Sequence, residues 1–197
     1  MRPPNMNESH YTIVTQEQGT PAWLEWRQQG IGASDASSIM GESRFKSGAA
    51  LLQEKRGKSR TFIQSAAMAK GVELEPEARR RYIETTGIEV HPICLQSTRY
   101  EWLRASLDGL SIHHDAVVEI KCGASAYRHA SECGTAPVYY YGQLQHILAI
   151  TGLASLDFWC FWPGYPEILI PVPRNDSYIE RLLQRESEFW SQVQDNG

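Results

Sequence analysis

The chain has 197 residues and a formal net charge of −4, and 42% of its residues are hydrophobic while 21% are charged. This length allows one sizeable hydrophobic core but not two comfortable domains, and the composition is typical of a soluble globular protein. No apolar run approaches the roughly 20 residues of a membrane-spanning helix, which argues against a membrane protein of that kind. We therefore expect one domain over residues 1–197.

Residues 1–19 are polar and lack the apolar stretch of a secretory signal, so we expect a loose N-terminal arm on a cytoplasmic protein. The four cysteines are scattered, without the spacing of a zinc site, and we expect reduced, mostly buried thiols. Two basic stretches, residues 55–60 and 79–81, could be solvated faces or contacts to nucleic acid.

Helices and strands can be assigned along the chain from capping residues and apolar periodicity. A first helix begins at Pro21 with Thr20 as its N-cap. A long helix covers residues 64–86 and runs to Gly87, with Pro76 as a point where it could kink or restart. The other predicted helices cover residues 34–41, 137–150 and 176–193, and the predicted strands cover residues 89–94, 100–105, 156–162 and 167–172, with a hairpin over 106–122. This order indicates an α/β fold in which helices flank a central mixed sheet.

The hairpin carries charges that a buried strand does not need. Alternation along a strand places Glu119 and Lys121 on one face, and pairing would bring Asp108 close to Glu119 at one end of the sheet. Adjacent carboxylates repel and are costly to bury, and Mg²⁺ relieves both problems because it prefers hard oxygen ligands, to which the Ile120 carbonyl could add. Alternatively, Asp108 forms a turn with Gly109, and Glu119 and Lys121 lie on a solvated face.

An acidic residue followed after about ten positions by Glu-x-Lys resembles the signature of the PD-(D/E)xK nuclease superfamily. Four further runs are similar to motifs of the phage lambda exonuclease and YqaJ recombinase family, in the same order. They are Trp26-Arg27 with GASD at 32–35, GVELEPEAR at 71–79, SLDG at 106–109 and YGQLQ at 141–145, and EIKC at 119–122 completes the Glu-x-Lys motif. The resemblance covers residues 23 to about 152. It departs at Gly123, where the family has proline.

The resemblance implies a restriction-endonuclease-like core and a Mg²⁺-dependent 5′-to-3′ exonuclease. Such an enzyme degrades one strand of linear duplex DNA and leaves a 3′ single-stranded overhang for recombination by strand annealing. It further implies one or two Mg²⁺ ions, with Mn²⁺ as a substitute, and substrates with 5′-phosphorylated ends. A single-strand annealing protein as partner and a ring-shaped homotrimer are also implied.

The resemblance also implies roles for individual residues. Glu75, Asp108 and Glu119 would hold metal with help from the Ile120 carbonyl, Lys121 would position or activate water, and Gln143 would contact that lysine or the substrate. Arg27 and Ser34 would bind the 5′-terminal phosphate, and Ser125 and Arg128 could also reach phosphate. A planar guanidinium fork suits a terminal phosphate, and Ser34 lies near an expected helix start.

Several alternatives stay open at this point. Arg27 could simply cover Trp23 or Trp26, and Gln143 and Gln145 could form an exposed helix face. The chain could be an endonuclease of the same superfamily, which would cut circular DNA, or a DNA-binding subunit without catalysis. A glycoside hydrolase with two carboxylates is the remaining class, and its chemistry needs neither lysine nor metal.

Overall fold

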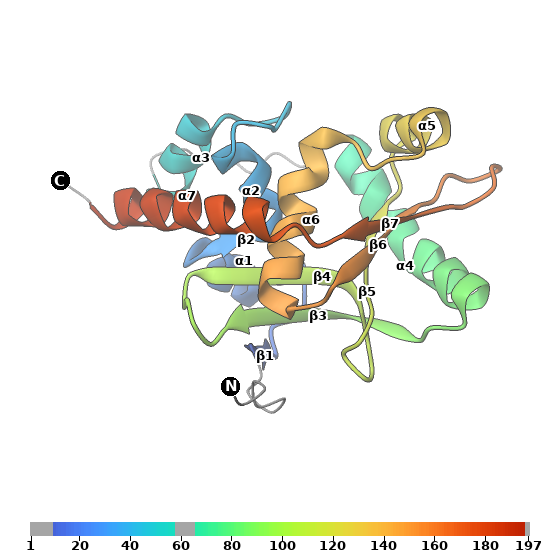
Figure 1. Cartoon of the computed structure of the whole chain (residues 1–197), viewed down its shortest axis with the longest axis horizontal. Coiled ribbons are helices and arrows are strands. Elements are labelled where there is room, and N and C mark those ends of the chain that lie inside the picture. The colour runs from blue at the N-terminus through green and yellow to red at the C-terminus, as the bar shows by residue number, and fades with distance from the viewer. Residues whose placement is uncertain (1–9, 58–65, 196–197) are drawn as a thin grey trace.

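The computed structural model describes residues 10–57 and 66–195, which form a seven-stranded mixed sheet with helices on both faces (Figure 1). The main strand order is β1-β3-β4-β5-β6-β7, and β2 pairs with β4. The strands are β1 (Tyr11–Val14), β2 (Ile31–Gly32), β3 (Val90–Ser97), β4 (Leu103–Ser111), β5 (Val117–Lys121), β6 (Ser155–Cys160) and β7 (Ile168–Pro173). The pairs β2–β4 and β5–β6 are parallel and the other pairs are antiparallel.

Helices cover the sheet from two sides. They are α1 (Pro21–Gln28), α2 (Ala33–Ile39), α3 (Gly48–Lys55), α4 (Ala66–Thr86), α5 (Ala124–Cys133), α6 (Val138–Thr151) and α7 (Asp176–Gln194). The larger apolar cluster joins one face of the sheet to α5, α6 and α7, and a second cluster joins the opposite face to α4. The expected α/β layering around a mixed sheet is confirmed.

The N-terminal arm is one point where the expectation was wrong. Residues 11–14 form β1, which pairs antiparallel with β3, because Tyr11 has an apolar ring that the core can bury. The first nine residues of the expected arm lie outside the described ranges.

None of the helices within the described ranges is long and apolar enough to cross a bilayer.

Other differences concern short elements. The strand expected over residues 100–105 and the first strand of the hairpin are one strand, β4. The sequence analysis did not predict α3, α5 or β2, which has only two residues. Pro76 lies inside α4 without dividing it. All four cysteines are free and most of them are buried, as expected, with Cys133 as the exposed one.

Gly109 follows Asp108 at a point where the sheet has no room for a side chain. An added Cβ would lie 2.7 Å from Val118 Cγ1 and 2.8 Å from Val90 Cγ2. We expect Gly109→Ala to lower the free energy of unfolding by about 1–3 kcal/mol, because both valines must move.

In the matched variant Gly71→Ala, inside α4, the new Cβ meets no described atom within 4 Å. The free energy of unfolding of that variant should rise by roughly 0.5–1 kcal/mol, because alanine has a higher helix propensity than glycine. Urea unfolding curves measure both changes, and a shift in the same direction for both variants would contradict the packing argument.

Candidate active site

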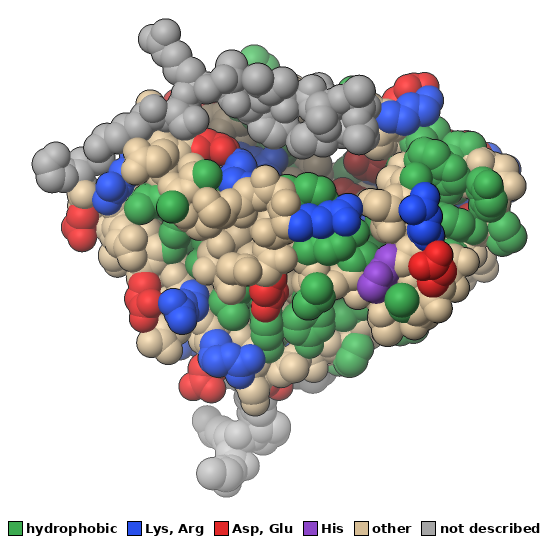
Figure 2. All heavy atoms as spheres, turned by 90° about the horizontal axis from the view of Figure 1, so that it is seen from above, with side chains coloured by type: hydrophobic (Ala, Val, Ile, Leu, Met, Phe, Trp, Pro, Cys, Tyr) green, Lys and Arg blue, Asp and Glu red, His purple; other side chains and the backbone are tan. Residues whose placement is uncertain are grey.

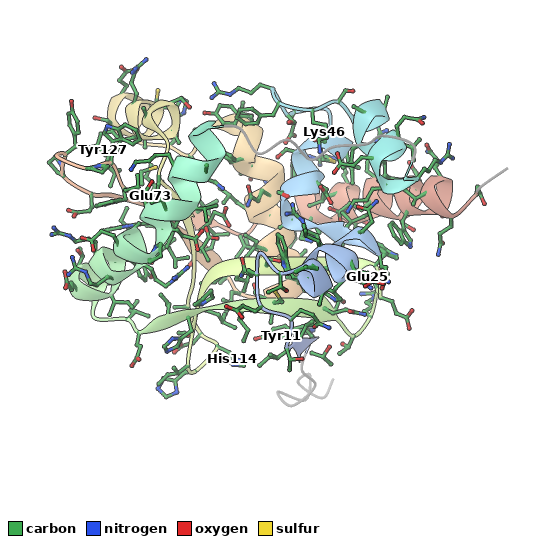
Figure 3. All side chains as sticks on the ribbon, turned by 180° about the vertical axis from the view of Figure 1, so that it is seen from behind. Tyr11, Glu25, Lys46, Glu73, His114 and Tyr127 are labelled. Atoms are coloured by element: carbon green, nitrogen blue, oxygen red, sulfur yellow. The ribbon has the colours of Figure 1, made fainter. Side chains whose placement is uncertain are left out.

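The acidic residues of the hairpin meet α4 and α6 at one end of β4 and β5. Asp108 comes from β4, Glu119 and Lys121 from β5, Glu75 from α4 and Gln143 from α6, and we call these five residues the acid cluster. Figure 3 shows the molecule from behind, relative to Figure 1, and labels Glu73 on α4, two residues before Glu75. Figure 2 shows acidic side chains inside a hollow of the surface and basic side chains near its rim.

Glu119 is the most deeply buried of these acids, with only 2% of its surface exposed. Its Oε1 atom accepts hydrogen bonds from Lys121 Nζ and from Gln143 Nε2, each at 2.5 Å. Its Oε2 atom is buried and has no hydrogen-bond partner among the described residues. Burial, reinforced by the charge of Asp108, raises the pKa of Glu119 to about 7. The free oxygen is therefore suited to a cation or a proton.

Asp108 and Glu75 are linked through Arg79, to which the sequence analysis gave no role. Asp108 Oδ2 accepts a bond from the Ile120 N–H at 2.7 Å. Arg79 Nε donates to the backbone carbonyl of Asp108 at 2.6 Å, and its guanidinium also pairs with Glu75. Burial raises the pKa of both carboxyls, and the charge of Asp108 adds to the rise at Glu75. Arg79 thus ties the acid of α4 to the acid of β4.

Lys121 and Gln143 complete the cluster. Burial alone would lower the pKa of Lys121, but the neighbouring charge of Glu119 outweighs it and holds that pKa above its ordinary value. Gln143 Nε2 donates to Glu119 and not to the lysine, and the expected contact of Gln143 with the substrate stays a prediction. Gln145 is fully buried, where its amide bonds to Pro173 and to the Asn175 N–H, so the alternative of an exposed glutamine face is wrong.

The donor set suits a hard divalent cation. Three carboxylates and the carbonyl of Ile120 offer oxygen ligands, and Glu119 Oε2 has no competing partner among the described residues. Within the described ranges, however, no three acidic, histidine or cysteine side chains are already grouped around a point that could hold a metal. Arg79 pairs with Glu75, while Lys121 and Gln143 occupy one oxygen of Glu119. A cation at Glu119 Oε2 would therefore draw its further carboxylate ligands from Glu75 and Asp108, which already accept hydrogen bonds.

Arg27 and Ser34 lie together, as a shared anion site requires. The Arg27 guanidinium donates to Ser34 Oγ, and Ser34 is exposed in the first turn of α2. The guanidinium also lies 5.2 Å from the Trp23 ring centroid, so the alternative that it covers this tryptophan is found as well. Trp23 Nε1 donates to Ser106 Oγ at 2.8 Å, two residues before Asp108. The pair Arg27 and Ser34 is thus connected to the strand that carries Asp108.

Ser125 and Arg128 lie on α5, immediately after β5, and both are exposed. Ser125 Oγ accepts a hydrogen bond from Arg44 at 2.9 Å. The Arg44 guanidinium lies 4.1 Å from the centroid of the Tyr139 ring on α6. The sequence analysis missed Arg44, because a single arginine in a loop carries no pattern. The place of Arg44 beside Ser125 and Tyr139 depends on how α6 packs, which the local sequence does not predict.

In the first basic stretch, Lys55 does not lie on a solvated face. Lys55 is buried, pairs with Asp35 at 2.9 Å and donates to the Gly30 carbonyl at 2.7 Å. Arg56 donates to the carbonyl of Gln192. Lys58 and Arg60 lie outside the described residues.

In the second stretch, Arg80 and Arg81 pair with Glu77 on the exposed side of α4. Only Arg79 of that stretch reaches the acid cluster.

Solved structures with a similar fold include exonucleases. An alkaline exonuclease from Laribacter hongkongensis, LHK-Exo, superposes with a TM-score of 0.78 at 25% identity, covering 89% of this chain and 93% of that one. The structure of LHK-Exo in complex with dAMP gives 0.79 at 26% identity over the same shares. A phage related exonuclease from Haemophilus somnus 129PT gives 0.63 at 13% identity, covering 83% and 93%, which supports the fold alone. The expected restriction-endonuclease-like architecture, a mixed sheet flanked by helices, agrees with these structures.

The chain also has a relative identified by sequence. The uncharacterized protein YqaJ of Bacillus subtilis (strain 168) is 27% identical over 180 residues, which covers 89% of this chain. The chain spans only about half of that relative, 56% of its length. The family model for the YqaJ-like viral recombinase domain matches residues 22–154, which contain every residue of the acid cluster. The chain therefore belongs to the YqaJ-like viral recombinase domain family.

Proposed function

We propose that the chain is a Mg²⁺-dependent exonuclease that degrades the 5′-ended strand of linear duplex DNA and leaves a 3′ overhang for strand annealing. The observation that carries the proposal is the buried Glu119 carboxylate, which has one oxygen free among the described residues and Lys121 bonded to the other. A carboxylate in this setting is suited to bind a divalent cation, and the adjacent ammonium is suited to bind a phosphate or orient a water. The similarity to alkaline exonucleases supports the same reaction class.

The acid cluster would hold one or two Mg²⁺ ions, for which Mn²⁺ is expected to substitute. Glu75, Asp108 and Glu119 would supply carboxylate oxygens, with the carbonyl of Ile120 as an additional ligand. When bound, the metal supplies Lewis-acid chemistry that activates water and neutralises charge on phosphate. Lys121 would orient the attacking water and stabilise charge on the phosphate oxygens, and Gln143 would orient the Glu119 carboxylate.

The pair Arg27 and Ser34 would bind the 5′-terminal phosphate. A guanidinium presents a planar fork of N–H donors that matches phosphate oxygens, and the hydroxyl of Ser34 is already within its reach. A pocket that accepts a terminal phosphate would make the enzyme start at an end. Ser125 and Arg128, which both lie on α5, would contact phosphates further along the strand.

Digestion of linear duplexes labelled at either end tests the proposal. We expect label to be released first from the 5′ end, with Mg²⁺ or Mn²⁺ and not with EDTA. Release from the 3′ end, or undiminished release with EDTA, would contradict the proposed polarity or metal requirement. Cleavage of covalently closed circles would indicate an endonuclease instead, and tight binding without any cleavage would indicate an inactive DNA-binding subunit.

The raised pKa values predict how the metal-free protein responds to pH. The folded state holds protons on Glu119, Asp108 and Glu75 more tightly than the unfolded chain does. Stability is therefore present at low pH and is lost as pH rises from the ordinary carboxyl range through about 7, the pKa of Glu119. Mg²⁺ binds the deprotonated acids, so it should raise Tm more at about pH 8 than at about pH 6.

Thermal melts in EDTA and in Mg²⁺ across this pH range measure both effects. Glu119→Gln is the matched variant, and its melting temperature should depend less on pH and on Mg²⁺. Equal stabilisation by Mg²⁺ at both pH values would contradict the assignment of these carboxylates as ligands.

Assembly is the remaining part of the proposal. We expect a homotrimeric ring around duplex DNA, acting in the cytoplasm with a single-strand annealing protein. Light scattering should then give about three times the chain mass of 22.3 kDa. A monomer at micromolar concentration would contradict the ring.

A further inference from the structure

Tyr140 lies against the ammonium group of the acid cluster. Lys121 Nζ is 4.6 Å from the centroid of the Tyr140 ring, within the range of a cation–π contact. Tyr140 and Gln143 are three residues apart on α6, so they share one face of the helix. One turn of α6 thus contacts both Lys121 and Glu119, the two charged residues of β5.

Aromatic neighbours hold the Tyr140 ring in place. Its centroid is 6.1 Å from that of Phe158 on β6 and 4.7 Å from that of Tyr139. Phe158 is completely buried and pairs with Glu119 across the parallel strands β5 and β6. The ring that faces Lys121 is therefore supported by the same part of the sheet that carries Glu119.

Lys121 needs a second support if Glu119 binds a metal ion. In the structure, Lys121 Nζ and Gln143 Nε2 both bond to Glu119 Oε1. A divalent cation on this carboxylate would compete with the ammonium, because two positive charges on one carboxylate repel each other. The Lys121 side chain is 19% exposed, so solvent offers it an alternative position.

We propose that Tyr140 is a positioning residue. Its ring face would keep the Lys121 ammonium in the site when Glu119 binds a metal ion. The inference rests on the proposed metal-dependent function, and the contact itself does not depend on it. A ring face attracts an ammonium without offering an oxygen for which the metal would compete. Tyr140 thereby keeps Lys121 next to the position of the phosphate, while Gln143 keeps its bond to Glu119.

Progressive fluorination of residue 140 tests this role in the intact protein. Phenylalanine and its mono-, di- and trifluorinated forms have nearly the same size, but each fluorine withdraws charge from the ring face and weakens its attraction for a cation. We expect Tyr140→Phe to retain activity. Across the fluorinated series kcat should fall stepwise, by roughly 3- to 30-fold in total, at constant KM for DNA. A kcat that is constant across the series would overturn the proposal, since a packing role is insensitive to ring charge.

A second measurement does not require activity. Protons above an aromatic ring resonate upfield, so the Lys121 side-chain methylene next to the ammonium should show an upfield shift in the metal-free protein. This shift should persist after addition of Mg²⁺ alone and vanish in Tyr140→Leu. It should survive in the control variant Tyr165→Leu, which removes an exposed tyrosine whose ring lies 5.6 Å from that of Tyr127. Loss of the shift on addition of Mg²⁺ would overturn the proposal. If the shift persists while the protein digests no DNA, the proposed function fails and the positioning contact stands.

Discussion

Replacing Lys121 with alanine is expected to lower the rate of DNA digestion by roughly 10²- to 10⁴-fold, the range typical of a residue that handles the attacking water. The ammonium group is the one basic group bonded to the buried Glu119 carboxylate among the described residues, and it faces the Tyr140 ring. No water can replace a fixed positive charge at that position. Initial rates on a 5′-phosphorylated linear duplex in Mg²⁺ measure the effect.

Binding and folding controls separate catalysis from damage. The Lys121→Ala variant should bind the same duplex with nearly unchanged affinity in Ca²⁺, measured by fluorescence anisotropy. Lys70→Ala removes a lysine of α4 that is 51% exposed and pairs only at the surface with Glu73, so it should digest DNA at the normal rate. Undiminished turnover of Lys121→Ala would remove this lysine from the mechanism.

Replacing Arg27 with alanine should impair digestion of 5′-phosphorylated duplexes about 10- to 100-fold, which corresponds to losing a charge-assisted bond of about 1.5–3 kcal/mol. Duplexes with a 5′-hydroxyl should be affected much less, because they offer no terminal phosphate for the guanidinium. The comparison uses kcat/KM on the two substrates, which differ in one phosphate.

Two further variants sharpen the test of Arg27. Arg27→Lys keeps the positive charge but loses the planar fork, and it should recover only part of the discrimination. Arg181→Ala removes an exposed arginine of α7 that lies 5.6 Å from the Tyr178 ring centroid, and it should digest both substrates normally. If Arg27→Ala slows both substrates equally, its role is to cover Trp23 and the phosphate assignment fails.

The sequence predicted the hairpin part of the acid cluster because its spacing is local, whereas Glu75 and Gln143 were expected only from the resemblance to the family. Alternation along a strand places Glu119 and Lys121 on one face, and a hairpin brings Asp108 next to them, so the contact between Lys121 and Glu119 follows from order alone. The alternative of a solvated face was wrong at Glu119. Its strand is covered by helices on both sides, which local alternation does not reveal.

The contacts that the sequence could not predict join distant elements. Arg79 reaches the carbonyl of Asp108 from α4, and Lys55 pairs with Asp35 between α3 and α2. Tyr140 contacts Lys121 only because α6 packs on the sheet next to β5. Gly142 allows this helix to approach Ser37 closely. Such contacts depend on how helices lie on the sheet, and a periodic pattern fixes the buried face of a helix but not its neighbours.

Anomalous diffraction from crystals soaked in Mn²⁺ tests the central claim most directly. We expect a peak in contact with carboxylate oxygens of Asp108 and Glu119, accompanied by a weakened bond between Lys121 and Glu119. The same soak of Glu119→Gln crystals should give a weaker peak or none. Crystals of the native chain that bind manganese elsewhere, with these carboxylates still held only by Lys121, Gln143 and Arg79, would contradict the claim.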